Sequence, residues 1–93
     1  MNARTVCSHA PGIVSRTING EAVLVNPARR KIQVLNPMGA KVWDLLDGRR
    51  ELGDMIAIIA VEYRQPHDAV ERDVMSFCED LVRRELIAID ESQ

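Results

Sequence analysis

The spacing of apolar side chains changes part-way along the chain from a period of two to a period near 3.6. Before the change, residues 13–18 and 21–25 are rich in Val, Ile and Leu and flank the dipeptide Asn19-Gly20. Both residues of Asn-Gly accept the positive φ that a type I′ turn requires. The pattern therefore predicts a two-stranded hairpin in which Ile18 pairs with Glu21.

A second turn is expected to return the chain as a third strand. Alternation places Ile32 and Val34 on one face of this strand, and Lys31, Gln33 and Leu35 on the other. Because the second strand lies at the centre of such a meander, the third strand keeps a free edge. A free edge promotes aggregation unless it is covered or charged.

From Asn36 the period becomes helical. Asn36 is a suitable N-cap, and Pro37 occupies the first helical position, where its missing N–H costs nothing. Asp47-Gly48 is expected to end this first helix. The second helix is predicted over residues 51–63, where apolar side chains recur at helical spacing before Gln65-Pro66 stops it.

A third helix is predicted to begin with a capping box, with Asp68 as the cap and Glu71 at the third position. It runs to about Arg84, and residues 86–89 follow as a short closing strand or extended tail. The prediction is a small α+β domain with a three-stranded antiparallel N-terminal sheet, three helices (βββααα) and a short C-terminal apolar segment. Its expected boundaries are a mobile tail over 1–11, a domain over 12–89 and a frayed end over 90–93.

Composition fits one soluble domain of 93 residues with 46% hydrophobic and 28% charged residues. The net charge of −2 hides an asymmetry, since residues 1–50 carry eight basic and three acidic side chains, and residues 51–93 carry four and eleven. The basic clusters at 29–31 and 49–50 are either solvated loop charge or a contact surface for an acidic partner.

The chain shows no arrangement typical of catalysis. Its five glycines are scattered, and no Ser or Cys has an obvious base. Cys7 and His9 make at most two ligands of a metal site in a segment predicted to be mobile. We therefore expect no enzyme activity and no cofactor. The absence of a signal peptide, of a membrane span and of a CxxC pair favours the cytoplasm.

Two helices followed by a short β element also describe a winged helix, so a DNA-binding regulator is the alternative. In its recognition helix, residues 67–85, six acidic side chains stand against three arginines. Phosphate would repel such a helix, because nucleic-acid affinity comes mostly from neutralising phosphate charge. Nucleic acid is therefore not an expected partner.

The third helix carries two apolar stripes. The first contains Phe77 and Leu81 and suffices to pack against the other helices, while Met75, Cys78 and Val82 form a second stripe. The second stripe either widens the buried face or lines a groove. An apolar groove beside a free strand edge is the arrangement used in β-augmentation, in which a guest peptide adds a strand to the sheet.

Residues 35–48, LNPMGAKVWDLLDG, resemble the LN-x-x-G-x-x-[IV]-W-x-L-L-D-G signature of the PqqD family. Val70, Asp73-Val74, Phe77 and Leu81 match its V-x-x-DV-x-x-F-x-x-x-L pattern, and the similarity covers about residues 12–89. Glu85 departs from the pattern, because the family usually has Gly there.

The resemblance implies a winged-helix-like peptide-recognition domain that binds the leader of a ribosomally made precursor peptide and presents it to a modifying enzyme. That enzyme would be a radical S-adenosylmethionine protein in pyrroloquinoline quinone (PQQ) synthesis, or a leader peptidase in lasso-peptide pathways. The expected peptide-binding residues are Arg29, Arg30, Lys31, Ile32, Gln33, Val34, Met75, Cys78, Glu79 and Val82. A homodimer through Met55, Ile58 and Val61 stays open.

Overall fold

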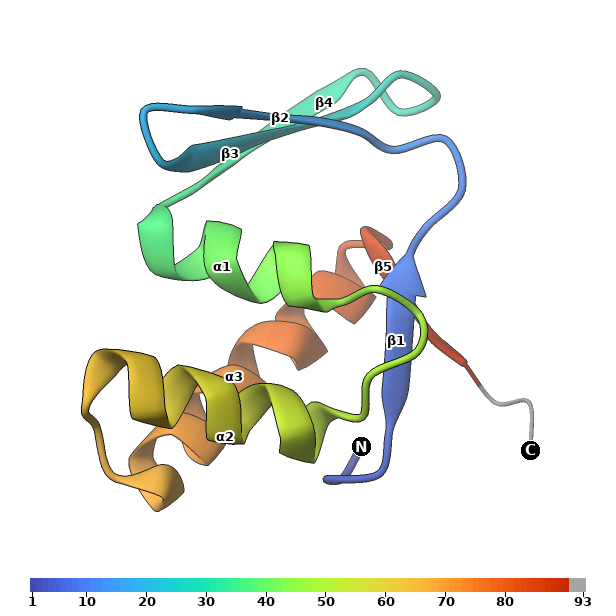
Figure 1. Ribbon diagram of the computed structural model, residues 1–93. Coiled ribbons are helices and arrows are strands. Elements are labelled where there is room, and N and C mark those ends of the chain that lie inside the picture. Colours follow the sequence, from blue (N-terminus) through green and yellow to red (C-terminus); the bar gives the residue numbers. More distant parts are fainter. Residues whose placement is uncertain (91–93) are drawn as a thin grey trace.

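The computed structural model describes residues 1–90. Within them the chain forms four strands, three helices and a last strand (Figure 1). The strands are β1 (Val6–His9), β2 (Val14–Ile18), β3 (Glu21–Asn26), β4 (Lys31–Leu35) and β5 (Ile87–Asp90), and the helices are α1 (Pro37–Leu45), α2 (Leu52–Tyr63) and α3 (His67–Arg83).

The strands make two antiparallel sheets, one of β2-β3-β4 and one of β1-β5. The α+β class and the order of a sheet followed by three helices are confirmed, but the sheet is split in two. The hairpin has the predicted register, with Ile18 opposite Glu21 and Arg16 opposite Val23. Asn19 and Gly20 take φ values of 54° and 82°, as a type I′ turn requires. The likeness to a winged helix stays a prediction.

Two of the helix ends that the sequence marks have the expected local chemistry, and one helix start does not. The Asn36 side chain accepts a hydrogen bond from the N–H of Gly39 at 2.8 Å, as expected of an N-cap. α2 ends at Arg64, which adopts the left-handed conformation before Pro66. The predicted capping box of α3 is wrong, because the helix begins at His67 after Pro66 and no side chain caps it.

The predicted mobile tail is wrong for residues 6–9, which form β1 and pair with β5. The side chain of Cys7 is fully buried. The main chain is also held from the other side, since Gly48 N–H donates to the Cys7 carbonyl and Leu52 N–H to the Thr5 carbonyl. A strand whose partner lies some eighty residues away leaves no local sequence signal. Of the predicted frayed end, Asp90 closes β5 and the rest lies outside the described residues.

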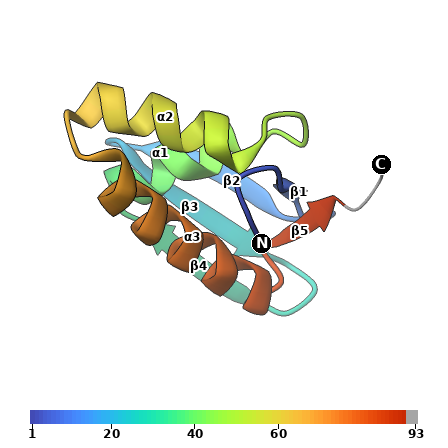
Figure 2. The same cartoon turned by 90° about the horizontal axis from the view of Figure 1, so that it is seen from below.

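The core lies between the three-stranded sheet and the helices. Ala22, Leu24 and Leu35 point from the inner face of the sheet toward α1, and Trp43 is 2% exposed beneath them. α2 and α3 pack below α1, while β1 and β5 close one side (Figures 1 and 2). The outer face of the sheet is covered by no helix or strand of residues 1–90. None of the described helices has the length and apolar character that a bilayer crossing demands.

Candidate functional site

The free edge of β4 exists in the structure. β3 is the central strand, and within residues 1–90 no strand pairs with the far side of β4. α3 packs mainly against α2 and β5, and β4 packs mainly against β3 and α1. The end of α3 nevertheless reaches β4, because the Arg84 side chain hydrogen-bonds to that of Gln33. Seen from below, α3 crosses in front of β4 (Figure 2), and the two lie in different layers of the molecule (Figure 1). The edge therefore remains open to an incoming chain.

The hairpin register decides which main-chain groups this edge offers. In an antiparallel ladder the pairs that exchange hydrogen bonds alternate with pairs that do not, and a two-residue hairpin closes on an exchanging pair. Counting from that pair, the main-chain groups of Leu24 turn toward β4 and meet those of Gln33. The N–H and C=O groups of Ile32 and Val34 therefore lie in the plane of the sheet and point away from β3, toward the free edge.

A cleft of about 400 Å³ separates β4 from the end of α3, and we call it the β4–α3 cleft. Its floor is apolar, with the buried side chains of Leu24 and Leu86. Its lining is Leu24, Asn26, Arg29, Lys31, Ile32, Gln33, Arg83, Arg84 and Leu86. Four of the residues expected from the sequence, those at 29 and 31–33, thus meet in one hollow.

Two polar bridges cross from β4 and its turn to α3 at this cleft. Arg84 Nη1 donates a hydrogen bond of 2.8 Å to Gln33 Oε1, and Arg29 forms an ion pair of 2.6 Å with Glu85. Glu85 has a φ of 62°, so this residue makes the left-handed turn that ends the helix. All four side chains lie at the surface, and their exposed ends can exchange partners at low cost.

The cleft carries an excess of positive charge. Arg83 and Arg84 both pair with Asp80, and Arg29 pairs with Glu85. Among the described residues, Lys31 and Arg30 take part in none of the ion pairs. A guest peptide with carboxylates would therefore meet cations along the edge.

The second stripe of α3 does not face this cleft. Cys78 is fully buried, and burial raises the pKa of its thiol to about 12, with the Cys7 thiol nearby adding to the shift. It belongs to the core, which corrects its expected place in the groove. Val82 borders a different hollow with the β1–β2 loop and β5, Met75 is half-buried, and Glu79 is exposed. The helix presents Arg84 to β4 instead.

A third hollow, of about 460 Å³, lies among the three helices beyond the other end of β4. Tyr63 and Phe77 line it together with apolar side chains of α1 and α2. Gly39 sits where the elements meet, because a Cβ there would stand 3.2 Å from both Leu35 Cβ and Phe77 Cζ. Sequence periodicity assigned Phe77 to the core and missed this hollow, which depends on three helices meeting.

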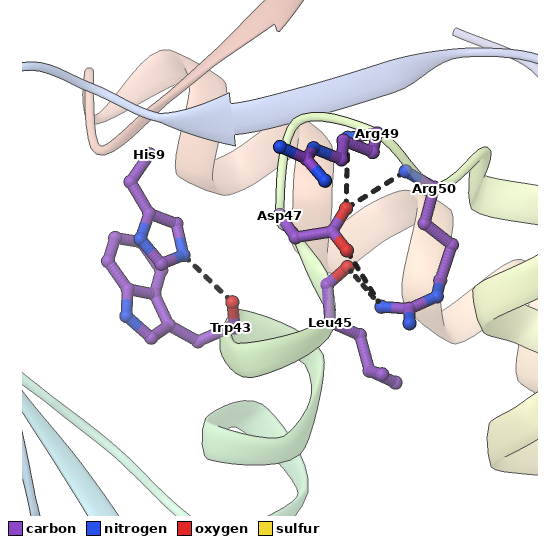
Figure 3. A network of polar contacts seen from close by, with 6 residues as sticks. All are labelled: His9, Trp43, Leu45, Asp47, Arg49 and Arg50. Atoms are coloured by element: carbon purple, nitrogen blue, oxygen red, sulfur yellow. Dashed lines mark hydrogen bonds and ion pairs between the residues drawn. The ribbon is translucent and has the colours of Figure 1, made fainter.

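The second basic cluster serves the fold. The Asp47 carboxylate accepts hydrogen bonds from the main-chain N–H groups of Arg49 and Arg50, both at 2.9 Å, which hold its pKa below the ordinary value (Figure 3). Arg50 Nη1 also donates to the Leu45 carbonyl at 3.1 Å. The cluster orders the loop after α1.

The His9 side chain also has a structural role. Its ring stacks on Trp43 at 3.6 Å, with Nε2 against the Trp43 carbonyl at 2.8 Å (Figure 3).

The comparisons with known proteins bear on this geometry. The family model of coenzyme PQQ synthesis protein D (PqqD) matches residues 21–87, which span β3 to the start of β5. The chain belongs to the PqqD family. This confirms the resemblance carried by the LN-x-x-G-x-x-[IV]-W-x-L-L-D-G signature.

Two relatives extend the PqqD match to nearly the whole chain. A curated "PqqA binding protein" of Gluconobacter oxydans (strain 621H) is 26% identical over 83 residues, which cover 89% of this chain and 86% of the relative. A solved structure, "TbiB1 in Complex with the TbiA(beta) Leader Peptide", superposes with a TM-score of 0.80 at 26% identity and covers 92% of this chain and 98% of that chain. Both likenesses cover more of the chain than the family model, which matches residues 21–87.

Proposed function

We propose that this PqqD-family protein binds the leader of a ribosomally made precursor peptide by β-augmentation along β4. The observation that carries the proposal is the open edge of β4 beside a cleft that has leucine side chains on its floor and cations around them. The similar proteins support it, since one is named for binding PqqA and the other was solved with a leader peptide. Neither name favours the DNA-binding alternative.

The leader would lie as a fourth strand next to β4. Its main chain exchanges hydrogen bonds with Ile32 and Val34, and each bond contributes only about 0.5–1.5 kcal/mol net. Alternate leader side chains point into the β4–α3 cleft, over Leu24 and Leu86. These apolar contacts decide the affinity, because main-chain bonds are the same for every sequence.

The charges at the cleft select the leader further. Lys31, Arg30 and Arg84 favour acidic side chains near the edge, and the bridge from Arg84 to Gln33 must open or shift as the guest enters. Screening of exposed charges predicts that affinity falls as salt rises to physiological strength. Of the residues expected from sequence, those of β4 and its turn stay in the proposed site.

The protein presents the bound leader to a modifying enzyme and does no chemistry itself. That enzyme is a radical S-adenosylmethionine protein in a PQQ-type pathway, or a leader peptidase in a lasso-type pathway. A cytoplasmic location accords with two free, buried cysteines. A homodimer through α2 loses one of its supports, because Met55 is 1% exposed and belongs to the core.

The test uses synthetic PqqA and the TbiA(beta) leader as probes. Calorimetry measures binding, and amide chemical-shift mapping on the labelled protein locates it. We expect at least one probe to bind with its largest shifts at Ile32, Val34 and Arg84, and with small shifts at Ser15 and Thr17 on the other edge. Shifts centred on the β2 edge or on the hollow next to Val82 would contradict the proposal, as would a lack of binding by both probes.

A further inference from the structure

The outer face of the three-stranded sheet is a continuous apolar surface. Val14, Ile18, Ile32 and Val34 are each more than half exposed, with Ile32 at 71%, and all of them point to this side. Val23 and Val25 lie between them on the central strand. The helices all lie on the opposite side of the sheet (Figure 1).

An antiparallel sheet with one face on the core usually turns polar side chains to water on the other face. Here β-branched aliphatic residues occupy most of the outward positions, as they do on the inner faces of β-sandwiches. Contiguous apolar patches of this kind mark interaction surfaces. The face is therefore suited to packing against a second sheet.

The charged residues on the outer face indicate which partner sheet would fit it. Arg16 and Glu21 are its two charged residues, and they occupy neighbouring strands in diagonal positions. Within residues 1–90 neither takes part in an ion pair. A face with one cation and one anion is neutral and complementary to itself when two copies meet around a two-fold axis.

We propose that this outer face is the contact between two copies of the chain, which pack sheet on sheet with Arg16 of each copy opposite Glu21 of the other. The contact uses the outward side chains of Ile32 and Val34, whereas the leader would pair with the main chains of these residues at the strand edge. The proposal is independent of leader binding, and each can fail alone.

The size of the face sets the strength of the contact. Three strands about 4.8 Å apart and roughly 17 Å long give a footprint of about 240 Å² per sheet. The total buried area counts both sheets, and the uneven surface of the side chains roughly doubles it again. Even so, it stays near or below the ~1,200 Å² at which standard stable interfaces begin. The expected dimer is therefore weak and depends on concentration.

Sedimentation velocity of the whole chain, from low-micromolar to near-millimolar concentration, tests the proposal. We expect the average sedimentation coefficient of the wild type to rise toward the dimer value. Arg16→Glu should weaken association by about tenfold or more, because like charges then face each other in both symmetric pairs. The double variant Arg16→Glu/Glu21→Arg should restore it.

Ser15→Glu is the control, since it introduces the same carboxylate on the same strand but on the other face. It should dimerise as the wild type does. Circular dichroism shows whether each variant is folded, and leader binding by Arg16→Glu should be unchanged. A wild type that stays monomeric throughout, or an Arg16→Glu variant that still dimerises, would overturn the proposal. Failure of the double variant to recover would do the same.

Discussion

β2 and β4 are the two outer strands of one sheet, and each presents a row of unpaired main-chain groups. β2 is exposed along its whole length, whereas β4 borders the β4–α3 cleft with its apolar floor and its cations. The hairpin register turns Ser15 and Thr17 outward on one edge, and Ile32 and Val34 on the other. A free edge alone can thus pair with any extended chain, whereas a neighbouring cleft makes the pairing selective for the side chains of the guest peptide.

Proline substitutions test the difference between the β4 and β2 edges most directly, because they remove a main-chain hydrogen-bond donor. Val34→Pro removes an outward N–H from the β4 edge, and edge strands tolerate proline where the N–H faces solvent. We expect leader affinity to fall more than about tenfold, because the guest loses a hydrogen bond and meets the ring. Thr17→Pro removes the equivalent N–H from β2 and should leave affinity unchanged in calorimetry. Equal losses in both variants would place the guest elsewhere.

The charge at the cleft should have a smaller effect. Arg84→Glu replaces the cation that bridges to Gln33, whereas Arg72→Glu makes the same change at an exposed position of α3 that does not line the cleft. We expect affinity for an acidic leader to drop about three- to fivefold in the first variant only, as suits exposed charges. The difference should shrink at high salt. An Arg84→Glu variant that binds as the wild type does would remove Arg84 from the site.

The turn at the end of α3 provides a test on stability. Glu85→Gly relieves a left-handed residue, and this gain should exceed the loss of the exposed pair with Arg29. We expect the free energy of unfolding in urea to rise by about 0.5 kcal/mol. Glu79→Gly, within the helix, should instead lower it by about 1 kcal/mol. A lower stability for Glu85→Gly would mean that the ion pair outweighs the strain.

The loop after α1, remote from both edges, gives the smallest expected effect. The main-chain N–H groups of Arg50 and Arg49 hold the pKa of Asp47 below its ordinary value. Its contribution to stability is therefore present above that ordinary pKa and is lost as pH falls through the lowered folded value. Asp47→Asn should lower Tm at neutral pH, and the gap to the wild type should close in acid. A gap that is constant with pH would show that the charge of Asp47 has no part in it.

Features built from neighbours in sequence were predictable. The Asn19-Gly20 turn set the register of the hairpin. The sequence also indicated residues 31–34 as the edge strand, and the pairing of β3 with β4 in the structure then selected Ile32 and Val34 as the residues with outward main-chain groups. Asn36 capped α1 as its chemistry requires. For this reason the β4 half of the candidate site came directly from the sequence.

The α3 half did not. The periodicity of α3 shows two apolar stripes but not what each of them faces. Packing turned Cys78 into the core and Val82 toward β5, and it brought Arg84 to Gln33 across 51 residues of chain. A local pattern carries no information about the direction of a helix relative to a sheet edge.

The sequence by itself determined the hairpin and its register, the three helices and the strand that keeps a free edge, because each of these depends on residues close along the chain. The family followed from the motifs of the same segments. Only the tertiary structure decided that residues 6–9 pair with 87–90, which side of α3 meets β4, and that one sheet face stays uncovered. The physical reason is that pairing and packing between distant segments depend on the apolar surface that both segments bury together. The sequence of one segment alone does not contain this information.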